Sequence, residues 1–175
     1  NVSLRQLVWM DRSGNITESI GTPRVSMNAP ALSPDDRKIA VKARDRGNDD
    51  IWVFDAKRGS STRLTFDLAR DLYPDWSPDG TEVMFTSYRN GNPDLFRTRA
   101  SGGAEVVPVV TGAAFTLESS WSKQGRHIVF GGGDSGTEVW ALDLAGEGKP
   151  FRLMENSRAI REVVFSPDGR YIAYT

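Results

Sequence analysis

The sequence predicts an all-β protein, a β-propeller made of four-stranded blades, and two repeated patterns lead to this prediction. One pattern is a turn of the type Ser-Pro-Asp-Gly, and the other is a strand of the type Ile-Trp-Val-Phe-Asp. Each pattern returns every 44 or 45 residues over the whole chain. Tandem four-stranded units of this length are typical of propeller blades. The turns lie at 33–36, 77–80, 122–125 and 166–169, and the strands at 7–11, 51–55, 95–98 and 139–143.

Each repeat divides into four short strands. The first strand ends in a large apolar residue directly before the serine of the turn, and the second is the apolar run that follows the turn. The third carries the aromatic pattern, and the fourth is short. Frequent β-branched and aromatic residues between turn residues favour strands, and no segment has the apolar period of a helix. The large residues that end the first strands are Leu32, Trp76, Trp121 and Phe165.

The recurring turn has a structural explanation. Proline sets φ near −65° at its second position, and aspartate suits the next position. Glycine accepts the positive φ at which the chain enters the following strand. The residues that we expect to form these turns are Pro34, Asp35, Pro78, Asp79, Gly80, Gly125, Pro167, Asp168 and Gly169.

The repeat divides the 175 residues into one propeller domain of about four blades. Half blades at 1–22 and 156–175 flank complete blades at 23–67, 68–111 and 112–155. The two half blades add up to one blade, so the chain could close on itself as a four-bladed ring, or a homodimer could close an eight-bladed ring. A fragment cut from a longer propeller would have the same phase. The dimer is slightly favoured, because the small residues near the axis do not suit a tightly curved ring.

Composition excludes several classes of function. The net charge of −1 argues against a nucleic-acid partner, and no apolar run is long enough for membrane insertion. The chain has no cysteine and one histidine, His127, so we expect no metal, no cofactor and no catalytic set that could use Ser135 as a nucleophile. The carboxylates before the third strands lack the spacing of a calcium loop, and they are Asp49, Asp50, Asp94 and Glu138.

The residues also resemble a known family. The runs at 73–80 and 85–96 read Tyr-Pro-Asp-Trp-Ser-Pro-Asp-Gly and Phe-Thr-Ser-Tyr-Arg-Asn-Gly-Asn-Pro-Asp-Leu-Phe, which are similar to the TolB-type propeller repeat. The resemblance covers essentially the whole chain, although the blade at 113–155 departs from the pattern. It implies a bacterial, periplasmic or otherwise extracytoplasmic protein. Such repeats occur in TolB itself, beside prolyl-oligopeptidase-type hydrolase domains, and in sensor modules.

We therefore expect a non-catalytic scaffold or sensor propeller that binds a protein partner through one loop face. The alternative is the substrate-gating propeller of a prolyl-oligopeptidase-type serine peptidase whose catalytic domain lies outside this chain. Propeller topology brings the loops between second and third strands, and those that enter the first strands, to the same end of the molecule. Tyrosine and arginine are enriched at interaction hot spots. The expected partner-binding residues are Arg46, Arg70, Tyr73, Tyr88, Arg89, Asn90 and Arg161.

Overall fold

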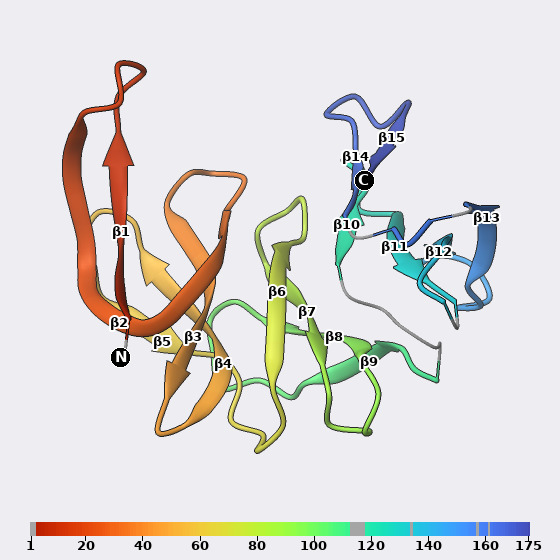
Figure 1. The fold of residues 1–175 in the computed structure, drawn as a ribbon, viewed down its shortest axis with the longest axis horizontal. Helices are drawn as coiled ribbons and strands as arrows, with labels where there is room; N and C mark the ends of the chain where they lie inside the picture. The colour runs from red at the N-terminus through yellow and green to blue at the C-terminus, as the bar shows by residue number, and fades with distance from the viewer. Residues whose placement is uncertain (1–2, 113–117, 134, 157, 161) are drawn as a thin grey trace.

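The computed structural model describes residues 3–112, 118–133, 135–156, 158–160 and 162–175. These residues form strands and turns and no helix, which confirms the predicted all-β class. The sheets follow one another across the molecule, from the N-terminal strands to the C-terminal pair (Figure 1). The first sheet has the order β1-β2-β3-β4-β5 and consists of β1 (Leu4–Met10), β2 (Ile16–Leu32), β3 (Lys38–Asp45), β4 (Asn48–Asp55) and β5 (Ser61–Arg63).

The remaining described strands form three further antiparallel sheets in sequence order. The strands that directly follow a Ser-type turn are β3, β7, β11 and β15, as the repeat predicts. The second sheet contains β6 (Asp71–Trp76), β7 (Glu82–Ser87), β8 (Asp94–Arg99) and β9 (Val107–Val110). The third contains β10 (Ser119–Trp121), β11 (His127–Gly132), β12 (Glu138–Asp143) and β13 (Phe151–Glu155), and the last pairs β14 (Val163–Phe165) with β15 (Ile172–Tyr174).

The expected boundary between a half blade and the first full blade, at residues 22 and 23, falls inside strand β2. Its N-terminal half pairs with β1 and its C-terminal half pairs with β3, so five strands share one sheet. The backbone changes direction through register shifts on either side of Asn28 and through positive φ at Ser26 and Ala29. Bulges of this kind bend a strand without a loop. The fourth strand of the N-terminal half blade and the first strand of the next blade are therefore one continuous strand, β2.

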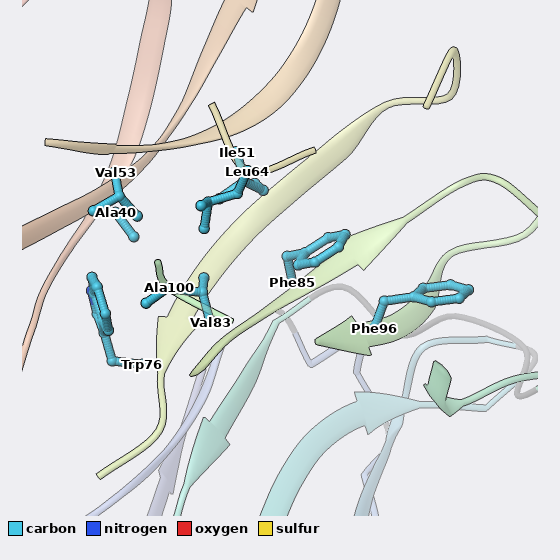
Figure 2. Close-up of a cluster of buried hydrophobic side chains, with 9 residues drawn as sticks. All are labelled: Ala40, Ile51, Val53, Leu64, Trp76, Val83, Phe85, Phe96 and Ala100. Atoms are coloured by element: carbon cyan, nitrogen blue, oxygen red, sulfur yellow. The ribbon is translucent and has the colours of Figure 1, made fainter. Parts of the chain in front are cut away.

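Apolar side chains fill the layers between neighbouring sheets. Successive residues of a strand point to opposite faces, and β3 shows the consequence. Ile39 and Val41 pack toward β1 and β2, whereas Ala40 packs toward the second sheet. In that second layer Trp76 lies against residues of the first sheet (Figure 2), and its Nε1 donates a hydrogen bond to the carbonyl of Ala31 at 2.9 Å. Large and small residues therefore interlock across the layer.

The Ser-Pro-Asp-Gly turns are closed by their own side chains. In the second repeat, Ser77 Oγ donates to Asp79 Oδ1 at 2.6 Å and accepts from the amide of Glu82 at 2.9 Å. The same serine-to-aspartate bond occurs at Asp35 and Asp168, and the serine hydroxyl lowers the pKa of all three carboxyl groups. Proline precedes the aspartate at Pro34, Pro78 and Pro167, and positive φ follows at Asp36, Gly80, Gly125 and Gly169.

Candidate functional site

Three loops meet at the end of the sheets opposite the turns at 33–37 and 77–81 (Figure 1). They are the β3–β4 turn at 45–48, the β5–β6 loop at 64–70 and the β7–β8 turn at 88–93. Hydrogen bonds join them to one another. Asn48 Nδ2 donates to the carbonyl of Asp67 at 2.7 Å, and the amide of Tyr88 donates to the carbonyl of Arg70 at 3.1 Å. We call this end of the molecule the loop face.

A buried carboxylate organises the positive charge of the loop face. Asp49 lies at the start of β4 and is almost fully buried. Its oxygens accept from Arg44 Nε and Nη2, both at 2.9 Å, and from Arg70 Nε at 3.3 Å, and Lys42 Nζ lies 3.4 Å away. Burial by itself would raise the pKa of Asp49, but the hydrogen bond from Arg44 and the charge of Lys42 outweigh it and hold the pKa below its usual value. Three cations share this one carboxylate, so the Asp49 cluster taken by itself carries net positive charge, with Asp45 and Asp67 close to it in the same loops.

The cations of this cluster reach the surface beside exposed apolar side chains. The Arg70 side chain is 59% exposed, and its guanidinium carbon lies 5.9 Å from the centre of the Tyr88 ring. Arg46 is exposed at the tip of the β3–β4 turn. Phe66 is 67% exposed and Leu68 is 96% exposed in the β5–β6 loop. We define the basic–apolar surface as Arg44, Arg46, Phe66, Leu68, Arg70 and Tyr88.

Two of the expected partner-binding residues make contacts within the chain: Arg89 is largely buried, whereas Asn90 is exposed but hydrogen-bonded. Arg89 is 18% exposed, and its Nε donates to Ser87 Oγ at 2.9 Å. Its guanidinium carbon lies 4.4 Å from the centre of the Phe96 ring, and Nη2 lies 3.5 Å from buried Asp71. Asn90 Nδ2 donates to Asp94 Oδ2 at 2.8 Å and so ties the β7–β8 turn to the next strand.

Tyr73 is not part of the loop face. Tyr73 is in β6 with a positive φ of 52° and lines a pocket of about 320 Å³ between the first strands of neighbouring sheets. Arg161 lies outside the described residues. The expected partner-binding residues did not include Arg44, Phe66 or Leu68. The sequence signal for Phe66 and Leu68 was the presence of two apolar residues in a segment between two expected strands.

The same pocket contains a titratable group that sequence reasoning did not identify. Asp75 accepts hydrogen bonds from the amide of Trp76 at 2.9 Å and from the amide of Trp121, in the next sheet, at 3.3 Å. Burial raises the pKa of Asp75 to about 6, although both amide bonds act in the opposite direction. One sheet further on, Ser120 Oγ accepts from the amide of Phe165 at 3.2 Å. Asp75 and Ser120 thus make the same kind of contact with a backbone amide of the next sheet, Asp75 through a carboxyl group and Ser120 through a neutral hydroxyl.

The described residues do not assemble the parts of a catalytic or metal site. His127 Nε2 lies 3.8 Å from Asp143 Oδ2, but that carboxylate is bound by Arg126 at 2.7 Å. Ser135 lies in an exposed turn. Within the described parts of the chain, no three His, Cys, Asp or Glu side chains are grouped to hold a metal ion. These same parts of the chain contain no helix that could cross a membrane.

Comparison with known proteins decides the family. The TolB beta propeller domain family matches residues 7–175. The chain belongs to the TolB β-propeller domain family. TolB from Acinetobacter baumannii has a similar solved structure, with a TM-score of 0.78 and 28% identity over 92% of this chain and 40% of that one. The predicted resemblance and the propeller class are thereby confirmed.

Two curated relatives of this TolB-family chain extend beyond it. Uncharacterized protein Atu1656 of Agrobacterium fabrum is 29% identical over 174 residues, which cover 88% of this chain and 58% of the relative. Uncharacterized peptidase YuxL of Bacillus subtilis is 29% identical over 120 residues, which cover 65% of this chain and 18% of the peptidase. The chain thus spans less than two thirds of the length of each.

Proposed function

We propose that this TolB-family propeller is a non-catalytic interaction domain that binds a protein partner through the basic–apolar surface. The observation that carries the proposal is the exposure of Phe66 and Leu68 beside Arg44 and Arg70 in loops that are themselves hydrogen-bonded to buried groups. Exposed apolar side chains rimmed by polar ones mark interaction sites. Arginine and tyrosine contribute strongly to such interfaces. Membership of the family supports an extracytoplasmic location.

The similarity to YuxL favours a second candidate. In a peptidase that carries a propeller, this chain would control which substrates reach a hydrolase domain, and the catalytic residues would lie outside it. Sequencing the parent gene separates the two functions. A downstream α/β-hydrolase with a Gly-x-Ser-x-Gly elbow supports the gating role, whereas its absence supports the interaction domain.

Photo-crosslinking tests the proposed surface directly. We would replace Leu68 with a photoreactive phenylalanine analogue in the native protein and irradiate cells of the source organism. The matched control carries the same analogue at Lys57, which is exposed in the β4–β5 turn at the opposite end of the sheets. We expect a discrete protein adduct from position 68 and none from position 57. The proposal fails if position 68 gives no adduct, or if both positions give the same adducts.

A further inference from the structure

We propose that the basic–apolar surface recognises an acidic segment of its protein partner, in which a carboxylate binds beside Arg70 and an apolar side chain packs on Leu68 or Phe66. This inference rests on the proposed function and adds the chemistry of the partner. It is carried by the charge balance around Asp49, by the fixed position of Arg70, and by the acidic residues that border the surface.

The charge balance leaves capacity for a second carboxylate. Arg44 donates to both oxygens of Asp49, Arg70 shares Oδ2 with it, and Lys42 lies near Oδ1. Among the described residues, the two terminal nitrogens of Arg70 have no hydrogen-bond partner, and Arg44 is 45% exposed. Guanidinium groups bind carboxylates through paired N–H donors. A carboxylate from outside would reduce the mutual repulsion of the two arginines.

The donors of Arg70 are already positioned for such a ligand. Its Nε is held by Asp49, its ring neighbour is Tyr88, and its carbonyl accepts the Tyr88 amide. A side chain that is fixed before binding loses less conformational entropy in the complex. Leu68 lies two residues away in the same loop, so a carboxylate and an apolar side chain only a few residues apart in the partner could reach both sites.

Acidic residues beside the surface argue against a uniformly anionic ligand. Asp67 is exposed in the same loop, and Asp45 is partly exposed and lies 3.5 Å from Arg63. A nucleic acid or an anionic membrane presents closely spaced phosphates, which these carboxylates would repel. A protein segment with separated acids and an apolar side chain avoids that repulsion.

The adduct formed at position 68 supplies the probe. Its cross-linked segment is sequenced by mass spectrometry, synthesised with a fluorescent label, and titrated with the native protein by anisotropy. We expect Asp or Glu in that segment, and we expect conversion of those acids to Asn or Gln to weaken binding at least tenfold. Arg70→Gln should cause a similar loss with the acidic peptide and little change with the amide peptide. Arg99→Gln, an exposed arginine at the far end of β8, should leave the affinity unchanged.

The outcomes separate the two proposals. If position 68 gives no adduct, the proposed function itself fails. If an adduct forms but its segment has no acidic residue, or if the amide peptide binds within twofold of the acidic one, only the present inference fails. Tighter binding of phosphatidylglycerol vesicles or of a single-stranded oligonucleotide, with the same dependence on Arg70, would also overturn it. Arg44→Gln serves as a second variant, and unchanged thermal melting shows that each variant is folded.

Discussion

Arg70 and Arg89 lie in neighbouring loops and were equally plausible partner-binding residues from the sequence. Arg70 directly precedes β6 and Arg89 lies in the turn after β7, and the repeat assigns both to the same loop face without separating them. The two side chains differ in exposure because of tertiary contacts. Asp71 and Phe96 lie against Arg89, whereas most of Arg70 faces solvent. The repeat therefore predicted that both arginines lie on the loop face, but it could not predict which of the two side chains is buried.

This difference leads to a prediction about stability. Arg89→Ala removes a cation–π contact and leaves buried Asp71 without its cation, so we expect a loss of about 1–3 kcal/mol in the free energy of unfolding. Arg70→Ala should change it by less than about 0.5 kcal/mol, as exposed substitutions usually do. Urea unfolding of both variants measures the contrast. Equal midpoints for the two variants would contradict the structural role of Arg89.

Asp75 predicts a pH dependence of stability. Its pKa is about 6 in the folded chain and near 3.8 when unfolded, so the folded protein holds this proton more tightly. Stability from Asp75 is therefore present below about pH 4 and is lost as pH rises through 6, by up to about 3 kcal/mol. Asp75→Asn should remove this part of the dependence.

The measurement is the difference in unfolding free energy between native protein and Asp75→Asn, followed from pH 4 to pH 7.5. Other carboxyl groups titrate equally in both proteins and cancel in the difference. We expect the variant to gain stability relative to the native protein as pH rises. A difference that does not vary with pH would show that the carboxyl group of Asp75 has an ordinary pKa.

At the scale of elements, the repeat predicted where the first strands end, because that information is local. Trp76 ends β6 and Trp121 ends β10, each directly before the serine of a turn. The continuous course of β2 could not be predicted in the same way. It depends on pairing with β1 on one side and β3 on the other, and those partners are distant in the sequence. Bulges near Asn28 then replace the loop that the repeat suggested.

Asn48 holds two loops of the interaction surface together, because it links the β3–β4 turn to the β5–β6 loop. Its Nδ2 donates to the carbonyls of Asp67 and Ala69 and to Asp50 Oδ1. Asn48→Ala should cost about 1–2 kcal/mol through unsatisfied acceptors, and should speed amide exchange of the β5–β6 loop. The matched control is Asn92→Ala, one repeat later and exposed. Equal exchange of residues 64–70 in both variants would refute the role of Asn48.

For the whole molecule, the layers between sheets bury apolar residues on both faces of the central sheets, but the two ends of the array differ. Within the described residues, the last sheet has only two strands, so β15 is an edge where the other repeats continue to a third strand, and β1 is the outer edge of the five-stranded sheet. Exposed apolar side chains accompany these edges, among them Leu4 near β1's start and Tyr171 and Tyr174 at β15. Unpaired edges with apolar side chains tend to pair with other strands.

We therefore expect the 175-residue chain, produced alone, to associate through these edges. The sequence-based prediction of an eight-bladed ring from two copies corresponds to about 39 kDa, twice the 19.3 kDa of one chain. Tyr174→Asp places a charge on the β15 edge and should return the mass to that of one chain, because charged edge strands resist pairing. Leu153→Asp is the control, since β13 is the edge strand of a complete four-stranded sheet. Light scattering that gives one chain's mass for the native sequence, or a dimer that survives Tyr174→Asp, would exclude pairing through β15.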